Sequence, residues 1–271
     1  AGVVGTAADG DRLIGMFNQL EVDCQGVVQE AERPTTRKTR IIASNQHVLR
    51  VDRETKRDIS TASFDRLVTF METAMPEIDV VLISDYNKGL VTETLMAQVI
   101  AAAKRHGKSV IVDPKGLDYT KYKGATLLTP NRKEASRAAG IDIVDDASLA
   151  EAARRILATA QLENLLITLG QDGMALFESG NPPYRIATRA RQVYDVSGAG
   201  DTVLSVLGLA LGAPAPVFTF EKIHENQVPT QVVATRLADP ESGAGAPVRE
   251  VAGMAGGILT SPATAGSTVP A

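Results

Sequence analysis

The strongest candidate for a reactive site is a glycine-rich segment that precedes an apolar stretch. Residues 195–202 read Asp-Val-Ser-Gly-Ala-Gly-Asp-Thr, and the uncharged residues that follow predict a helix ending near Leu211. The free backbone N–H groups and the positive dipole end of such a helix suit a phosphoryl group. Asp201 then lies where a general base for phosphoryl transfer would be placed. The alternative is that its carboxylate only stabilises the helix N-terminus.

A second segment, residues 129–134, follows a short predicted strand and reads Thr-Pro-Asn-Arg-Lys-Glu. Asn131 and Glu134 have the three-residue spacing of a capping box, which by itself explains them at the start of a helix. The functional alternative is that both side chains organise water around a magnesium ion that bridges nucleotide phosphates. The spacing alone leaves both interpretations open.

Three further segments place polar or glycine residues at the ends of predicted strands. Residues 168–173 read Thr-Leu-Gly-Gln-Asp-Gly, which predicts either a loop whose backbone approaches a nucleotide or a tight turn. Lys115, in the sequence Asp-Pro-Lys-Gly, is placed to meet a phosphate, and Asp85 has the equivalent position after another strand. For both residues the alternative is an ordinary solvated loop position.

Alternating strands and helices must position these residues. Residues 80–84 predict a strand buried on both faces, residues 92–106 predict a helix, and residues 109–113 predict a second strand. Thr92 is a suitable cap for the helix. Because the connections are short, this strand–helix–strand unit makes the two strands parallel.

The same alternation continues along the chain and defines the fold class. Further strands are predicted at residues 126–129, 165–168, 174–178 and 184–187, and further helices at residues 131–139 and 148–160. We therefore expect an α/β protein with a doubly wound, mostly parallel sheet and helices on both faces. Ligands of such folds bind beyond the carboxyl ends of the strands, so the candidate segments should converge on one rim.

The two ends of the chain differ from this pattern. Residues 38–43 and 46–51 predict a hairpin that turns at Ser44 and Asn45, which is either a small lid or an edge ribbon. Toward the C-terminus the chain becomes rich in Gly, Ala, Pro, Ser and Thr and carries no charge after Glu250. This composition predicts a largely disordered tail.

The composition argues against several classes of protein. The net charge of −4 and the absence of Trp disfavour nucleic-acid binding. Cys24 is the single cysteine, which excludes an internal disulfide framework and fits a reducing, cytoplasmic location. No signal-peptide pattern is visible at the start, and the uncharged residues 202–220 predict a buried helix better than a membrane span because they contain two prolines.

The chain resembles the PfkB-type (ribokinase-like) sugar kinases, and residues 195–202 match the C-terminal signature of that family. Within the family it is most similar to the kinase domain of the bifunctional heptose 7-phosphate kinase/heptose 1-phosphate adenylyltransferases. The segments that carry this resemblance are residues 33–40, 49–52, 84–89, 112–116, 123–131 and 193–202. The resemblance implies a partial kinase domain over residues 1–212, with a β lid at about 35–53, and a divergent tail over 213–271.

This resemblance implies ATP-dependent phosphorylation of D-glycero-β-D-manno-heptose 7-phosphate at its anomeric hydroxyl, a step toward the lipopolysaccharide core, with Mg²⁺ as cofactor. Asp201 would be the catalytic base. The anion hole would be formed by Gly198, Ala199 and Gly200. The nucleotide would be bound by Asn131, Arg132, Lys133, Glu134, Thr168, Gly170 and Gly173, with Mg²⁺ held mainly through ATP phosphates and water near Asn131 and Glu134.

The resemblance also implies roles at the sugar end of the site. Asp85, Lys115 and Arg40 would contact the substrate or its phosphate, and Asp195 would help to bind a monovalent cation. The hairpin would be the lid over the sugar, and two copies would form a homodimer through it. Because family members begin with a strand and a Gly-Gly-x-x-Asn segment upstream of this sequence, weak stability and a damaged sugar site are also expected.

Two other functions remain open. One is another PfkB-type kinase that acts on a fructose phosphate or ribose, and the other is a fragment that binds nucleotide without catalysis. A dinucleotide-dependent oxidoreductase is disfavoured, because its glycine fingerprint should follow an early strand and has a different spacing.

Overall fold

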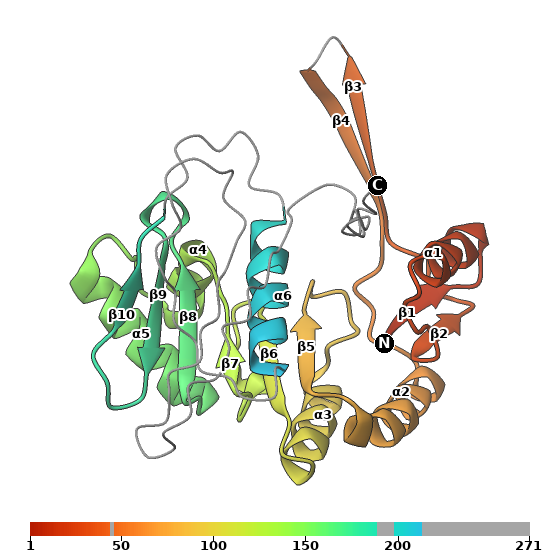
Figure 1. Ribbon diagram of the computed structural model, residues 1–271. Helices are drawn as coiled ribbons and strands as arrows, with labels where there is room; N and C mark the ends of the chain where they lie inside the picture. Colours follow the sequence, from red (N-terminus) through yellow and green to blue (C-terminus); the bar gives the residue numbers. More distant parts are fainter. Residues whose placement is uncertain (44–45, 189–197, 213–271) are drawn as a thin grey trace, which may run out of the picture. The chain divides into compact units, whose positions relative to one another are not determined.

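The strands predicted between residues 80 and 187 form one six-stranded sheet in the order β10-β9-β8-β7-β6-β5 (Figure 1). The parallel strands are β5 (Val80–Ser84), β6 (Ser109–Asp113), β7 (Leu127–Leu128) and β8 (Asn164–Thr168). The antiparallel strands are β9 (Met174–Glu178) and β10 (Tyr184–Ile186). The predicted α/β class with a mostly parallel sheet is therefore confirmed.

The computed structural model describes residues 1–43, 46–188 and 198–212. Three of the expectations concern residues outside this part of the chain. They are the hairpin turn at residues 44–45, the cation-binding role of Asp195 and the disordered tail of residues 213–271.

Helices cover both faces of the sheet, as predicted. One face is packed by α3 (Glu93–Arg105), α4 (Arg132–Ala139) and α5 (Asp146–Ala160), and the other by α6 (Ala199–Gly212). Side chains of a strand alternate between faces, so Ile111 packs against α6 whereas Val110 and Val112 enter the larger core on the opposite face.

The helix starts follow from local capping. Thr92 Oγ1 accepts a hydrogen bond from Leu95 N at 3.2 Å at the start of α3. Asn131 and Glu134 form a complete capping box at the start of α4, and Asp145 and Ser148 form a second one at α5. These side chains satisfy the first backbone N–H groups, which have no partner inside their own helix.

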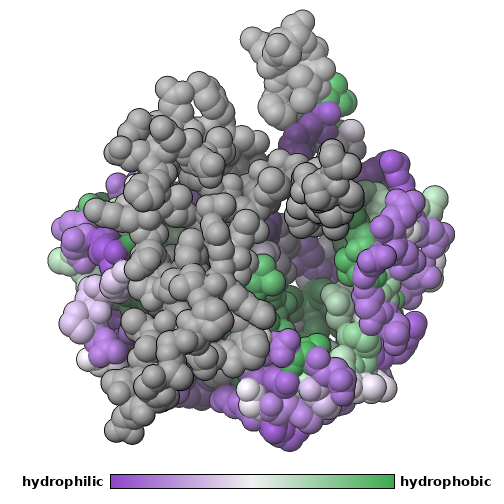
Figure 2. Space-filling model, viewed as in Figure 1, coloured by the Kyte–Doolittle hydropathy of each residue, from purple (hydrophilic) through white to green (hydrophobic). Residues whose placement is uncertain are grey.

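The prediction that β5 is buried on both faces is wrong. Among the described strands β5 pairs only with β6, which makes it the edge of the six-stranded sheet. Leu82, in the middle of β5, is 40% exposed, and Figure 2 shows apolar surface in this region next to α6. An apolar β-branched run therefore does not distinguish a central strand from an edge strand.

Four elements lie in stretches where the sequence pattern predicted nothing. β1 (Gly2–Gly5) and β2 (Val27–Glu30) form a parallel two-stranded sheet, connected by α1 (Ala8–Gln19). α2 (Thr61–Ala74) packs over β2 and against α3, where its Leu67 is buried. Three short 3₁₀ helices complete the described structure: Met75–Glu77, Thr120–Tyr122 and Gly170–Asp172.

The predicted hairpin is formed by β3 (Arg37–Ala43) and β4 (Gln46–Arg53), which pair antiparallel and project away from the six-stranded sheet (Figure 1). Residues directly opposite each other in such a pair lie on the same face. The pairs Ile41–Leu49 and Thr39–Val51 give one face an apolar stripe, and the pair Lys38–Asp52 lies on the other face. The hairpin is therefore amphipathic.

The helix predicted after the glycine segment is α6, which begins at Ala199 and ends at Gly212. Its buried residues are Leu204, Leu207, Gly208 and Ala210. Among the described helices, none combines the length and the apolar content that spanning a bilayer requires.

Candidate active site

The carboxylate of Asp201 lies at the carboxyl ends of β5 and β6, in the first turn of α6. Ser84 Oγ, at the end of β5, donates to Asp201 Oδ1 at 3.4 Å. Tyr86 Oη lies 3.5 Å from Oδ1 and 3.4 Å from Oδ2 of the same carboxylate. Asp201 itself is exposed. The carboxylate is therefore oriented by two hydroxyl groups and still open to a substrate.

The residues before Asp201 shape the N-terminus of α6. Gly198 has φ +81°, a conformation that favours glycine. Its carbonyl oxygen accepts hydrogen bonds from Thr202 N at 2.9 Å and Thr202 Oγ1 at 3.0 Å. Gly198, Ala199 and Gly200 are all exposed. Because the first N–H groups of a helix lack intrahelical partners, this turn can accept an anion.

Asp113 adds a second carboxylate beside this turn. A Cβ atom placed on Gly200 would lie 3.7 Å from Asp113 Oδ2, so the carboxylate faces the start of α6. Burial and the nearby Glu134 raise the pKa of Asp113 to about 6. The charge of Asp201 acts in the same direction, whereas Lys115 opposes it. The surroundings of Asp113 therefore favour the protonated, uncharged form of its carboxyl group.

The raised pKa predicts how Asp113 affects stability. The folded state favours the protonated form of Asp113. The stability that this protonated form contributes is therefore lost as the pH rises through about 6. Asp113→Asn should therefore raise the free energy of unfolding at about pH 7.5 by about 1–2 kcal/mol, after allowance for partial exposure, and by less at about pH 4.5. Urea titrations at both pH values measure this difference. An equal effect at the two values would contradict it.

Lys115 and Glu134 form an ion pair across the rim. The hydrogen bond from Lys115 to Glu134 is the main cause that raises the pKa of Lys115. Glu134 Oε2 also accepts from Asn131 N at 3.0 Å, and Asn131 Oδ1 accepts from Glu134 N at 3.0 Å. The capping interpretation of Asn131 and Glu134 is thus confirmed, and the carboxylate simultaneously holds the lysine beside the candidate anion site.

The donor set bears on how a magnesium ion could be bound. Within the described residues, no group of three or more His, Cys, Asp or Glu side chains could hold a metal ion. Mg²⁺ commonly keeps several waters and binds through one or two carboxylates together with substrate phosphates. The carboxylates of Glu134 and Asp113 fit this indirect mode, in which the nucleotide supplies most of the ligands.

The predicted nucleotide loop follows β8. A parallel bridge joins Thr168 to Asn131, and Thr168 N donates to Pro130 O at 3.0 Å, so this loop borders the start of α4. Gly170 has φ +64° and open space around it. Gly173 differs, because a Cβ there would lie 1.9 Å from Ile186 O. The glycine at position 173 is thus required by the close approach of β10.

Two basic residues in the first turn of α4 have different surroundings. Arg132 forms an ion pair with Asp172 in the loop after β8, and its Nε is buried without a hydrogen-bond partner among the described residues. Lys133 is exposed. Arg132 therefore ties α4 to the candidate nucleotide loop, whereas the side chain of Lys133 is accessible to a ligand.

Asp85 lies below the surface of the rim. It is 3% exposed, and its Oδ2 accepts from Lys121 Nζ at 2.5 Å and from Tyr122 Oη at 2.6 Å. Its Oδ1 accepts from Asn87 N at 2.7 Å. Both carboxylate oxygens are thus engaged by groups of the chain itself. This arrangement orders the loop after β5 and differs from the substrate contact that the sequence suggested.

Arg40 lies on the hairpin, away from the other candidate residues. It is exposed and stands opposite Arg50 in the register of β3 and β4. Arg50 Nε pairs with Asp52 Oδ1 at 3.1 Å. No hydrogen bond or ion pair joins Arg40 to the rim within the part of the chain described.

Sequence reasoning missed three side chains that the structure brings to the site. Ser84 and Tyr86 contact Asp201, and Asp113 faces the start of α6. All three lie at or just after the ends of β5 and β6. Their position at the strand ends was the available signal, because they flank or precede the candidates Asp85 and Lys115.

Comparison with known proteins extends over most of the described chain. The model of the pfkB family carbohydrate kinases matches residues 1–217. The bifunctional protein HldE of Desulfatibacillum aliphaticivorans is 53% identical over 215 residues, covering 79% of this chain and 44% of that protein. The protein of the same name from Geobacter metallireducens is 51% identical over 211 residues, covering 78% and 43%. The chain thus spans less than half the length of these curated relatives.

Solved structures show the same fold at low sequence identity. Ribokinase from Arabidopsis thaliana, complexed with ribose and ATP, has a TM-score of 0.60 at 21% identity, covering 79% of this chain and 69% of that one. The tetrameric inhibited form of phosphofructokinase-2 from Escherichia coli has a TM-score of 0.59 at 20% identity, covering 78% and 68%. The α/β fold is therefore ribokinase-like.

Proposed function

The chain belongs to the pfkB family of carbohydrate kinases, and we propose that it phosphorylates D-glycero-β-D-manno-heptose 7-phosphate at the anomeric hydroxyl with ATP. The observation that carries the proposal is the exposed carboxylate of Asp201, in the first turn of α6 beside the backbone N–H groups that begin this helix. The resemblance of residues 33–40, 84–89 and 123–131 to heptose 7-phosphate kinases supports the choice of sugar. Sequence identities of 53% and 51% to relatives named HldE agree with this choice of sugar.

Asp201 is the base in this mechanism. The anomeric hydroxyl oxygen attacks the γ-phosphorus in line, the bond from that phosphorus to the departing oxygen of ADP breaks, and Asp201 takes the hydroxyl proton. Ser84 and Tyr86 hold the carboxylate by their hydroxyl groups, so that it need not reorient when the sugar arrives.

The phosphoryl group is received at the N-terminus of α6. The backbone N–H groups of Gly198, Ala199 and Gly200 stabilise the charge on the group in transfer. Lys115, held by Glu134, adds a positive charge beside them. Asn131 and Glu134 would hold Mg²⁺ indirectly, through water and the phosphates of ATP, and the bound ion would supply charge neutralisation of those phosphates.

The nucleotide lies along the start of α4 and the loop after β8. Arg132 keeps that loop in place through Asp172, and Lys133 is open to the phosphates. Thr168 and Gly170 line the same edge; Gly173 serves the turn itself.

At the sugar end, the lid hairpin covers the substrate and Arg40 receives the distal phosphate. Arg50, directly opposite Arg40, is paired with Asp52, whereas the exposed Arg40 is available to an anion of the substrate. We assign Asp85 to the positioning of the loop after β5, and Asp195 to a monovalent-cation site near the anion-binding turn. The kinase domain covers residues 1–212, and its use of ATP as donor fits a cytoplasmic protein.

The substrate assignment is tested by the release of ADP from Mg-ATP with three sugars. Turnover with heptose 7-phosphate should exceed that with fructose 6-phosphate and with ribose. A higher turnover with fructose 6-phosphate or with ribose would show that the chain is a pfkB-type kinase for that sugar instead. Binding of ATP by folded protein without turnover on any of them would indicate a non-catalytic nucleotide-binding fragment.

The apolar face of the hairpin supports a homodimer through the lid. Leu49 and Val51 are 53% and 49% exposed, although they stand in line on one face. Exposed apolar stripes of this kind commonly mark interaction surfaces. Leu49→Lys should therefore convert a dimer into a monomer, as measured by light scattering after size exclusion. Val144→Lys, an exposed apolar residue before α5, is the matched control, and a monomeric wild type would contradict the dimer.

A further inference from the structure

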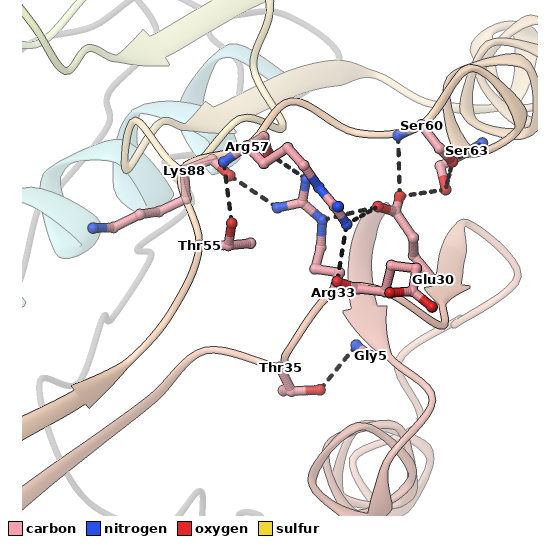
Figure 3. Close-up of polar contacts among 10 residues, drawn as sticks. Gly5, Glu30, Arg33, Thr35, Thr55, Arg57, Ser60, Ser63 and Lys88 are labelled. Carbon is pink, nitrogen blue, oxygen red and sulfur yellow. Dashed lines mark hydrogen bonds and ion pairs between the residues drawn. The ribbon is translucent and has the colours of Figure 1, made fainter.

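Arg33 is a buried charged residue to which the proposed mechanism gives no role. It is 7% exposed and lies between β2 and β3, at the base of the lid hairpin. Its Nη1 donates to the backbone oxygen of Lys88 at 3.0 Å, and its Nη2 donates to the backbone oxygen of Arg57 (Figure 3). One guanidinium thus joins the chain that enters the lid to the chain that leaves it and to the loop after β5.

Glu30 balances the charge of Arg33. The two are 3.6 Å apart, Nε to Oε1, and Glu30 also accepts from Ser63 Oγ at 2.7 Å and from Ser60 N at 3.2 Å (Figure 3). Burial alone would raise the pKa of Glu30, but these hydrogen bonds and the charge of Arg33 outweigh it and lower the pKa. The two terminal nitrogens of Arg33 and the Oε2 atom of Glu30 thus have hydrogen-bond partners, whereas Arg33 Nε is buried with only the ion pair to Glu30 among the described residues. The paired charges and these hydrogen bonds hold the guanidinium in place.

Further contacts fasten the leaving arm of the lid to the same loop. Gly89 has φ +77°, and a Cβ atom there would lie 2.0 Å from Arg57 O. Ile59 N donates to Gly89 O at 2.9 Å. Lys88 Nζ forms an ion pair with Glu54, just after β4. The base of the lid and the end of the loop are therefore joined by several contacts besides those of Arg33.

The other end of the loop reaches the catalytic carboxylate. Asp85 is anchored by Lys121 and Tyr122, so the loop is fixed at both ends. Tyr86, between the two anchors, lies 3.4 Å from Asp201 Oδ2 through its hydroxyl oxygen. A shift of the lid base thus changes where this hydroxyl meets Asp201.

We infer that Arg33 is a positioning residue that couples the lid to the catalytic carboxylate through the loop of residues 84–89. The inference rests on the proposed role of Asp201 as base. With the lid in place over the sugar, Arg33 holds the backbone of Lys88, and the loop presents Tyr86 to Asp201. Without Arg33, only the contacts of Lys88 and Gly89 with the leaving arm join the lid to the loop, and the coupling is weakened.

Arg33→Lys and Arg33→Gln test this coupling. Lysine keeps the charge for Glu30 but has one nitrogen in place of the two that reach the separate carbonyl groups of Lys88 and Arg57. The kcat should therefore fall roughly tenfold or more, and glutamine should cost more. The KM for ATP should change by less than about twofold, because the nucleotide contacts are untouched. In a Tyr86→Phe background the effect of Arg33→Lys should largely disappear, because the two substitutions break the same linkage.

A second measurement does not depend on activity. Hydrogen–deuterium exchange of the Arg33→Lys protein should accelerate in residues 53–59 and 84–89 and remain unchanged in strands β6 to β10 of the six-stranded sheet. Arg105→Gln, which breaks an exposed ion pair with Glu72, is the matched control and should leave both kinetics and loop exchange as in the wild type.

The two measurements separate failure of the coupling from failure of the proposed function. Unchanged exchange in residues 84–89, or a loss of kcat that is fully additive with Tyr86→Phe, would overturn the coupling. A wild type without heptose turnover would overturn the proposed function, and exchange would then decide the linkage alone. Should Arg33→Gln fail to fold, Arg33→Lys carries both tests.

Discussion

Asp201→Asn is expected to lower kcat by about 10²–10⁴-fold, because asparagine cannot accept the proton of the attacking hydroxyl. The KM for ATP should change little, since Asp201 touches no residue proposed to bind the nucleotide. The side chain is exposed, and among the described residues its hydrogen bonds are those with Ser84 and Tyr86 at 3.4–3.5 Å, so the melting temperature should remain close to that of the wild type. Steady-state kinetics and thermal melts measure both quantities.

Asp65 provides a control for this substitution. It is also an exposed aspartate on a helix, α2, but that helix packs against β2 and α3 and carries none of the candidate site residues. Asp65→Asn should leave kcat unchanged. If Asp65→Asn and Asp201→Asn lowered kcat equally, the proposed role of Asp201 as base would be contradicted.

Gly89→Ala, which adds one methyl group, is expected to lower the free energy of unfolding strongly. The left-handed conformation at φ +77° costs a residue with a Cβ about 1–2 kcal/mol. The overlap with Arg57 O, 2.0 Å from the new Cβ, adds about 1–3 kcal/mol because the backbone must move. The total loss of unfolding free energy should be about 2–5 kcal/mol, measured by urea titration.

Gly116 separates the two contributions. It has φ +101° at the neighbouring loop, but nothing lies within 4 Å of the position of its Cβ. Gly116→Ala should therefore show the conformational cost alone, about 1–2 kcal/mol. Equal losses for Gly89→Ala and Gly116→Ala would show that the contact between the loop and Arg57 is looser than the structure indicates.

Most of the predicted elements are long and locally marked, although α2, which has 14 residues and a Ser60 cap, was missed. α3, α4 and α5 have capping residues and apolar periodicity, and their predicted bounds agree with the structure to within about two residues. The parallel strands between them follow from the short connections. By contrast, β1 and β2 have four residues each, and α1 buries only Gly10. Such elements carry little periodic signal, because tertiary contacts and not local pattern define them.

Among the residues of the candidate site, those with a local sequence signal could be predicted and those defined by distant contacts could not. Asp201, Asn131 and Glu134 could be found because their neighbours in sequence form recognisable turns and caps. Arg33 could not, because its partners lie 24 and 55 residues away and arginine is rarely buried. Asp85 was found by its position, but its burial beneath Lys121 depends on a contact 36 residues distant. Local spacing identifies a strand end; it does not show whether a side chain there faces the ligand or the core.

The central claim is that this chain transfers a phosphoryl group to a sugar phosphate with Asp201 as base. The most direct measurement is ADP release from Mg-ATP in the presence and absence of heptose 7-phosphate, for the wild type and for Asp201→Asn. We predict release that depends on the sugar and falls by about 10²–10⁴-fold in the variant. Sugar-dependent release that is equal in the two proteins would contradict the assigned base, and no sugar-dependent release from folded wild type would contradict the proposed activity.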